Sequence, residues 1–511
     1  MHAPWRDDEV SSVVLPATGL RRLLVEPRRP EVVRRLPWAH WLVVGAVCIG
    51  AFMGQLDASI VTMAFPELRH HFGASLTSVQ WVGQSYLLVL IGLLMAVGRY
   101  ADMVGRKLLY TYGFALFVVA SALCGLAPSL PALVGFRALQ GVGAAMYQAN
   151  SVAILVGAIP KSRLGRAVGI QGAAQALGLA MGPAVGGALV GLGGWRLIFY
   201  VNVPVGALGV ALAWLLVPRS TNLSARARFD WAGLGLFGPA VCGLVLALSE
   251  GPRTGWASPA TLSLLGGAAL LGALFIARER RARAPMLRLD LFRRLPFSAG
   301  IASGLLSYMV LFGALTVVPF YLELAKGQPP GEAGLELLLL PLGLALAAPV
   351  AGRAAERLGA RPLTVGGMVL TGAVLLTTAT ATRDLTVVLA SLAAAGVGLG
   401  AFTPPNNAAI MSAAPPALSG LASGVLNMTR GLGTSLGLAI AGLAYTLGAS
   451  SGDARSLGAV NGYRDAALVL GAAALVSALV AATRGHDRLA AEPGRAPGYA
   501  SVVAEGALGS A

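Results

Sequence analysis

The chain has 511 residues, of which 56% are hydrophobic and only 12% are charged, and its mean hydropathy is +0.73. Soluble globular proteins usually carry about 25% charged residues, so this composition excludes an ordinary soluble domain and indicates a polytopic membrane protein. The net charge of +16 is also compatible with nucleic-acid binding, but the placement of the basic residues argues against that interpretation.

Fourteen strongly apolar segments follow a polar N-terminal tail. Each is about as long as the roughly 20 residues that a helix needs to cross a hydrocarbon core. Because helices of this length satisfy their backbone groups internally in lipid, the sequence predicts an all-α polytopic membrane protein. The approximate limits of the expected spans are residues 39–66, 79–101, 108–127, 131–157, 165–191, 197–217, 231–249, 258–277, 297–322, 331–352, 362–380, 385–412, 419–447 and 463–483.

The distribution of Lys and Arg predicts the side of the membrane that each loop faces, since cytoplasmic loops carry an excess of basic residues. With the N-terminus in the cytoplasm, the tails and loops on that side hold 29 of the 38 basic residues, and the opposite side holds 7. This bias explains the high net charge without nucleic acid. It also places both termini in the cytoplasm.

A polar turn punctuated by glycines occurs twice between apolar segments. Residues 98–107 follow the second span, and a degraded copy at residues 352–361 follows the tenth. The repeat predicts two six-helix halves with two extra helices between them. The expected units are a cytoplasmic N-terminal tail (1–37), an N-terminal six-helix bundle (38–217), two extra transmembrane helices with a cytoplasmic loop (218–296), a C-terminal six-helix bundle (297–484) and a cytoplasmic C-terminal tail (485–511).

Asp57 is the residue whose position most directly indicates function. It lies well inside the first span and is the acidic side chain that we expect deepest in the membrane. An ionisable group in a span costs free energy and marks a functional site by default. We therefore expect Asp57 to bind and release a coupling ion, a proton or another cation. The alternative is that it serves only as a structural partner for a buried arginine.

Arg137 lies in the fourth span on a polar face that it shares with Gln140 and Gln148 at helical spacing. A buried guanidinium needs an acceptor, so we expect Arg137 to pair with Asp57 and to take part in proton coupling. A purely structural role is the alternative. Arg430 in the thirteenth span raises the same question, and the sequence names no partner for it.

The fifth span contains glycines at four-residue intervals. Gly178, Gly182 and Gly186 share one helix face, along which another helix approaches closely. Pro183 removes a backbone hydrogen bond and is expected to kink the helix, and Gly187 completes the pattern. The alternative is ordinary glycine-rich packing, because the chain has 67 glycines.

The two polar turns are candidates for a gate. In the first turn, Asp102 ends one helix and Arg106 begins the next. We expect Asp102 to accept hydrogen bonds from the N-terminus of a helix in the other half, such as the thirteenth span, and so to lock one conformation. The alternative is that these charges are only topology signals. The candidate gating residues are Gly98, Asp102, Gly105, Arg106, Glu356 and Arg357.

Polar side chains inside the spans are candidates for lining a largely apolar substrate cavity, although each alone is more often a contact between helices. They are Gln84, Tyr147, Gln148, Gln171, Gln175, Tyr308, Asn406, Asn407 and Arg430. The sequence has no GxxxxGK[ST], HExxH or paired-cysteine motif. We therefore expect no catalytic residue, bound metal or cofactor, and we expect an ion gradient, with protons as the coupling ion, to drive transport.

Several of these segments resemble the signatures of a known family. Residues 98–107 resemble the loop signature of the major facilitator superfamily, residues 137–141 its fourth-helix signature, and residues 178–187 the fifth-helix signature associated with antiporters. Residues 56–61 and 195–204 resemble signatures of its fourteen-span subgroup.

Over about residues 38–484 the chain thus resembles the fourteen-span drug:proton antiporters of that superfamily. The resemblance implies two six-helix bundles plus two extra central helices, with a binding site between the bundles. It also implies alternating access, proton coupling at Asp57 and Arg137, and a gating role for Asp102. Glu356 stands where the second turn usually has Asp, and the later half has no second deep carboxylate, which argues against coupling to more than one proton.

Together these features predict a multi-pass exporter in the inner or plasma membrane. Its expected substrates are lipophilic small molecules, cationic or uncharged, such as drugs, antibiotics or related metabolites. One alternative is a proton-coupled uptake symporter of a small organic solute. Another is a membrane sensor or enzyme without transport, although the loops offer no catalytic pair. The expected partners are the substrate and membrane lipids, without nucleic acid, and the chain is expected to be a monomer.

Overall fold

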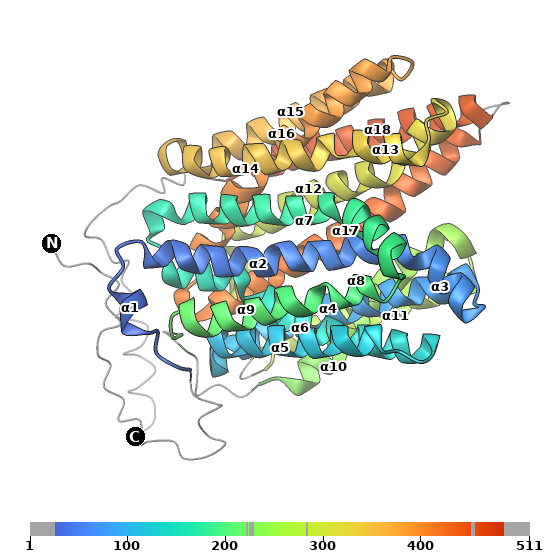
Figure 1. Ribbon diagram of the computed structural model, residues 1–511. Coiled ribbons are helices and arrows are strands. Elements are labelled where there is room, and N and C mark those ends of the chain that lie inside the picture. The colour runs from blue at the N-terminus through green and yellow to red at the C-terminus, as the bar shows by residue number, and fades with distance from the viewer. Residues whose placement is uncertain (1–25, 221–222, 224–228, 283–284, 451–454, 485–511) are drawn as a thin grey trace.

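The computed structural model describes residues 26–220, 223, 229–282, 285–450 and 455–484. All regular structure in these residues is helical, as the composition predicts (Figure 1). Most of the two predicted tails, residues 1–25 and 485–511, lies outside the described part of the chain.

The helices follow one another in the order expected from the apolar segments. The N-terminal half contains α1 (Glu31–Arg34), α2 (Ala39–Ile60), α3 (Phe65–Phe72), α4 (Leu76–Val104), α5 (Arg106–Gly125), α6 (Leu130–Ala158), α7 (Leu164–Gly193), α8 (Leu197–Tyr200) and α9 (Asn202–Leu216). The extra pair is α10 (Trp231–Thr254) and α11 (Pro259–Glu279). The C-terminal half contains α12 (Leu295–Phe320), α13 (Pro330–Leu337), α14 (Leu339–Leu358), α15 (Ala360–Thr380), α16 (Leu385–Ala413), α17 (Ser419–Ala449) and α18 (Arg455–Ala482).

Thirteen helical segments of the described chain are long and apolar enough to cross a membrane. The long helix outside that set is α6, because Arg137, Gln140, Gln148 and Asn150 lower its hydropathy. It has 29 residues and packs against α2, α4 and α5 inside the N-terminal half. With α6 included, the structure agrees with the fourteen predicted spans.

Several predicted spans are longer or more interrupted than the sequence indicates. The first continues through a 3-10 turn (Val61–Ala64) into α3, whose first turn accepts Pro66 because that position needs no backbone N–H donor. The ninth ends in a π-helical segment (Tyr321–Ala325), and the last begins at Arg455 instead of residue 463.

The two polar turns are tight because a glycine stands at each corner. Gly105 has φ 129° between α4 and α5, and Gly359 has φ 82° between α14 and α15. This region of backbone conformation favours glycine, which has no Cβ. Each turn therefore joins two long helices with a single intervening residue. We call the end of the molecule that holds these turns the motif end.

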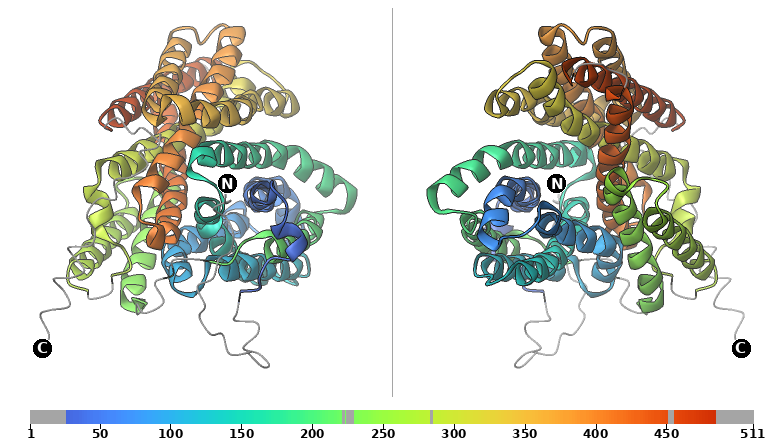
Figure 2. Two further views of the ribbon diagram at one scale, coloured as in Figure 1. Left: turned by 90° about the vertical axis from the view of Figure 1, so that its left-hand side faces the viewer. Right: turned by 90° about the vertical axis from the view of Figure 1, so that its right-hand side faces the viewer.

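The two halves contact each other mainly through α4 with α17 and α7 with α14 (Figure 2), and further contacts join α6 with α17 and α7 with α16. The extra helix α10 touches both α4 and α17, so the α10–α11 pair lies beside one of these interfaces instead of between the halves. Away from the motif end, α15 and α16 tilt away from the N-terminal half (Figure 1).

Candidate functional site

Asp57 lies on α2 at the centre of a buried polar cluster inside the N-terminal half. Its side chain is inaccessible to solvent, with 0% exposure. Arg137 Nη1 donates to Asp57 Oδ2 at 2.8 Å, whereas Gln140 Nε2 and Asn202 Nδ2 donate to Oδ1 at 3.0 and 2.7 Å. The structure thus brings together the two residues predicted for proton coupling, and donors from α6 and α9 satisfy the carboxylate.

Hydrogen bonds and an aromatic ring hold the guanidinium of Arg137 in place. Its Nε donates to the carbonyl oxygen of Val82 at 3.0 Å, and its Nη1 also donates to Gln140 Oε1 at 2.5 Å. The guanidinium lies 4.4 Å from the ring centroid of Tyr86, within the range of a cation–π contact. Removing one partner of such a pair leaves an uncompensated buried charge. The Asp57 carboxylate is therefore the countercharge that keeps the buried Arg137 guanidinium paired.

Asn202 is a member of this cluster to which the sequence assigned no role. It is 1% exposed in the first turn of α9. The signal was present, because Asn202 falls within residues 195–204, which served only to identify the fourteen-span subgroup. The local sequence does not show that the start of α9 meets the middle of α2.

The glycine pattern of α7 forms the contact with α2. The three glycines that face α2 are Gly178, Gly182 and Gly186. A Cβ on Gly178 would collide with the carbonyl oxygen of Phe52, and one on Gly182 would collide with Ser59 Oγ. The contacted segment of α2, residues 52–60, is the segment that carries Asp57.

The remaining members of that pattern lie away from this contact. Gly187 has open space where a Cβ would be placed, so it is not required for the approach of α2. Pro183 lies inside α7, which continues as one helix to Gly193. The close approach predicted at Gly178, Gly182 and Gly186 is thus present at all three glycines.

Asp102 joins the two halves at the motif end. It is fully buried, and its Oδ1 and Oδ2 accept hydrogen bonds from the backbone N–H groups of Gly420 and Leu421 at 2.8 and 2.9 Å. These groups lie in the first turn of α17, the thirteenth span, so the predicted contact is present. Arg106 Nη2 lies 2.6 Å from Asp102 Oδ1 and donates to the carbonyl oxygen of Pro416 at 2.9 Å.

The second turn makes the equivalent contact with the roles of the halves exchanged: the acceptor lies in the C-terminal half and the donor in the N-terminal half. Glu356 at the end of α14 accepts a hydrogen bond from the backbone N–H of Arg166 at 3.1 Å, in the first turn of α7. Backbone approaches accompany both contacts, because a Cβ on Gly98 would collide with α17 and one on Gly352 would collide with Gly165. Both interfaces between the halves are therefore closed at the motif end.

The first turn has a further cap that the sequence did not reveal. Glu26 Oε1 accepts hydrogen bonds from the backbone N–H of Leu108 at 3.2 Å and from Ser220 Oγ at 2.7 Å. These contacts lie beside Gly105, at the start of α5. Arg357, which was predicted to belong to the gate, is exposed in the last turn of α14 and is not part of the buried contact.

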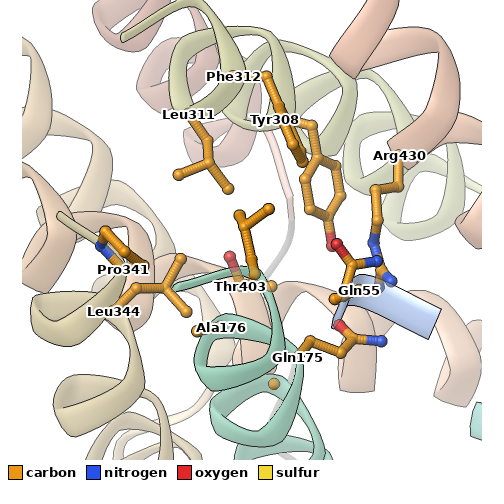
Figure 3. Close-up of a pocket in the computed structure, with 12 residues that line it drawn as sticks. Gln55, Gln175, Ala176, Tyr308, Leu311, Phe312, Pro341, Leu344, Thr403 and Arg430 are labelled. Carbon is orange, nitrogen blue, oxygen red and sulfur yellow. The ribbon is translucent and has the colours of Figure 1, made fainter. Parts of the chain in front are cut away.

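A pocket lies between the halves in the middle part of the helices (Figure 3). Residues of α2 and α7 line it from the N-terminal half, and residues of α12, α14, α16 and α17 line it from the C-terminal half. The lining residues are Gln55, Gly172, Gln175, Ala176, Leu179, Tyr308, Leu311, Phe312, Pro341, Leu344, Thr403 and Arg430.

Three of the nine predicted cavity residues line this pocket, namely Gln175, Tyr308 and Arg430. Gln84 does not, because its Nε2 donates to Glu250 Oε1 at 3.1 Å, toward the extra helix α10. The prediction for Tyr147 is also wrong. Its ring stacks on that of Phe114 in the core of the N-terminal half, with 4.6 Å between the ring centroids.

The other predicted cavity residues are buried within or between helices instead of lining the pocket. Asn406 donates to the carbonyl oxygen of Gly300 at 3.2 Å inside the C-terminal half. Gln148 lies beside Gly54 of α2. Gln171 and Asn407 are 2% and 5% exposed. Because buried polar groups require hydrogen-bond partners, polarity alone does not separate cavity residues from helix contacts. Gln55 and Thr403 were the polar lining residues that the sequence missed.

Comparison with known proteins agrees with this architecture. The family model described as the Major Facilitator Superfamily matches residues 47–327 and 300–505. Over 403 residues the chain is 37% identical to the multidrug resistance protein Stp of Mycobacterium tuberculosis, covering 78% of this chain and 75% of that protein. Over 439 residues it is 35% identical to the tetracenomycin C resistance and export protein of Streptomyces glaucescens, covering 85% of this chain and 79% of that protein.

Solved structures give the same fold at low sequence identity. A human organic anion transporter superposes with a TM-score of 0.62 and 15% identity, covering 88% of this chain and 100% of that one. The proton:xylose symporter XylE superposes with a TM-score of 0.60 and 16% identity, covering 86% of this chain and 94% of that one. The chain is therefore a transporter and not an enzyme, and it belongs to the major facilitator superfamily, among its multidrug efflux proteins.

Proposed function

We propose that this chain exports lipophilic small molecules across the cell membrane in exchange for protons, by alternating access. The observation that carries the proposal is the buried ion pair between Asp57 of α2 and Arg137 of α6. Asp57 lies two residues from Gln55, which lines the pocket between the halves. The printed functions of the relatives, multidrug resistance and tetracenomycin C export, support the outward direction.

The motif end faces the cytoplasm in this proposal, because the tails and loops at that end carry the large excess of basic residues. The contacts of Asp102 with α17 and of Glu356 with α7 then close the cytoplasmic side in the structure. Export requires a second state in which these contacts open and the opposite side closes.

Coupling is indirect, because the carboxylate and the pocket lie on different faces of α2. Asp57 faces α6 and α9, whereas Gln55 faces the pocket. The helix α7 touches both regions, since Gln175 lines the pocket and Gly182 packs against Ser59. A shift of α2 that follows protonation of Asp57 therefore changes the pocket without any contact between proton and substrate.

Two further assignments belong to the proposal. The chain works as a monomer, because both halves of one chain complete the pocket. It lies in the cell membrane in contact with lipids, with both termini in the cytoplasm. The coupling ion is one proton per cycle, which Asp57 carries without any other cofactor.

The test uses purified protein in proteoliposomes with an acidic lumen. The probes are ethidium and three anthracenes that carry a carboxylate, a carboxamide or an aminomethyl group. We expect gradient-driven accumulation of at least one probe by the wild type. Asp57→Asn should abolish that accumulation and retain exchange of the same probe without a gradient. Glu332→Gln, which makes the same change at an exposed residue, is the matched control.

Two outcomes would reject parts of this proposal. If Asp57→Asn accumulates probe as the wild type does, Asp57 is not the coupling group. If the wild type accumulates probe only when the lumen is alkaline, substrate and proton move together, and the protein is an uptake symporter.

A further inference from the structure

The pocket between the halves contains a positive charge that no side chain of the described chain neutralises. Arg430 lines the pocket from α17 and is only 8% exposed. Its Nε and Nη1 atoms are buried and have no hydrogen-bond partner among the described residues. Figure 3 shows the guanidinium pointing toward Gln55 and Tyr308.

Arg430 lies deep in the molecule, where a charge without a partner is costly. Arg430 lies eleven residues beyond Ser419, roughly 16 Å along α17 from the motif end at 1.5 Å per residue. A guanidinium stays protonated in proteins, and a buried charge without a partner is strongly unfavourable. Buried charges in proteins are normally paired, so the Arg430 guanidinium requires a partner from outside the chain.

Asp57 does not supply that partner. Its two oxygens already accept hydrogen bonds from Arg137, Gln140 and Asn202, and it is inaccessible to solvent. Of the described residues that line the pocket, none is acidic. The countercharge for Arg430 is therefore expected to arrive with the substrate.

The residues around Arg430 indicate the shape and polarity of the ligand as well as its charge. The guanidinium lies 5.3 Å from the ring centroid of Tyr308, whose buried hydroxyl has no partner among the described residues. Both groups are hydrogen-bond donors without a partner among the described residues, so an acceptor bound in the pocket would satisfy them. Leu311, Phe312 and Leu344 provide an apolar wall on the same cavity. The site therefore combines donors at one edge with a wall suited to an aromatic or aliphatic body.

We propose that the substrate is a lipophilic organic anion, an apolar body bearing a carboxylate or an acidic phenol or enol, and that Arg430 and Tyr308 bind its anionic group. This inference rests on the proposed function, because it takes the pocket between the halves as the substrate site. It reverses the cationic or neutral charge that the sequence predicts.

The test compares three anthracenes that share one ring system and differ in charge: anthracene-9-carboxylate, anthracene-9-carboxamide and 9-(aminomethyl)anthracene. Binding to the purified full-length chain is measured by fluorescence titration, without a proton gradient. We expect the carboxylate to bind most tightly. Arg430→Gln should weaken its binding about tenfold to one-hundredfold, the usual effect of losing a hydrogen bond to a charged group, and should leave carboxamide binding unchanged.

Two variants separate loss of charge from loss of fold. Arg430→Lys keeps the charge and should retain part of the preference for the carboxylate. Arg69→Gln makes the same change at an exposed residue of α3 and should behave as the wild type. The inference is overturned if the wild type prefers the amine or the carboxamide, or if Arg430→Gln weakens all three compounds equally.

The transport assay distinguishes this inference from the proposed function. Tight binding of the carboxylate without gradient-driven accumulation of any probe would reject proton-driven export and retain the anion site. Gradient-driven accumulation of the amine alone would retain export and reject the anion site.

Discussion

Replacing Asp102 by Asn tests whether the cap on α17 holds the motif end closed. The carboxylate accepts two backbone hydrogen bonds from the first turn of α17 and pairs with Arg106 across 2.6 Å. An amide in its place keeps one oxygen as an acceptor, but its NH₂ group then faces a backbone N–H. The variant therefore retains the size of the side chain and loses the charge and one acceptor.

The magnitude follows from these contacts. Losing one charge-assisted hydrogen bond costs about 1.5–3 kcal/mol, and losing a negative charge at a helix N-terminus costs about 0.3–1 kcal/mol. The closed motif end is thus destabilised by about 2–4 kcal/mol. Since 1.4 kcal/mol corresponds to a factor of 10, the population ratio of closed to open shifts by at least about 30-fold.

Hydrogen exchange in peptides that cover residues 416–426 measures this shift, because opening exposes the amides of Gly420 and Leu421. We expect Asp102→Asn to accelerate their exchange about 30-fold or more. Glu356→Gln is the matched comparison, and it should accelerate exchange near Arg166 by a smaller factor, because Glu356 accepts one backbone hydrogen bond from the described residues, against two for Asp102. Unchanged exchange at Gly420 and Leu421 in Asp102→Asn would refute the gating argument, even if transport were lost.

Two further predictions concern α2 and its neighbours. Asp57→Asn alone should lower the free energy of unfolding by about 3–5 kcal/mol, because Arg137 remains as a buried unpaired charge. Adding Arg137→Gln should recover part of the melting temperature without restoring transport, and a double variant no more stable than the single one would contradict this account. Gly182→Ala should destabilise the protein by about 1–3 kcal/mol, because its Cβ would meet Ser59. Gly187→Ala is the control and should leave the melting temperature unchanged, since open space surrounds that position; equal melting temperatures for both glycine variants would show that close packing on α2 is unimportant.

The sequence predicts the membrane helices and those contacts that a buried charge requires. Fourteen apolar segments had to become helices, and a buried Arg137 needed an acceptor, which Asp57 provides. Asp102 at a helix end needed donors, which the start of α17 provides. In each case the physical cost of leaving a charge unsatisfied leaves few alternatives.

The cavity was harder to predict, because polar residues in helices have several ways to be satisfied. Gln84 meets Glu250 on an extra helix, and Asn406 meets a backbone carbonyl. Gln55 lies two residues from Asp57, but only the rotation of α2 in the bundle shows that it faces the other half. Such rotations depend on packing between distant segments, which a single sequence does not encode locally.

The separation of Asp57 and Gln55 onto two faces of α2 has a consequence for how such transporters diversify. Substitutions at the pocket, for example at Gln175 or Thr403, leave the hydrogen bonds of Asp57 intact. Under the proposed function, changes at the pocket after gene duplication would therefore yield descendants that carry new compounds and keep proton coupling at Asp57. In that scheme, selection for new substrates and selection for coupling act on different residues, which on α2 are Gln55 and Asp57.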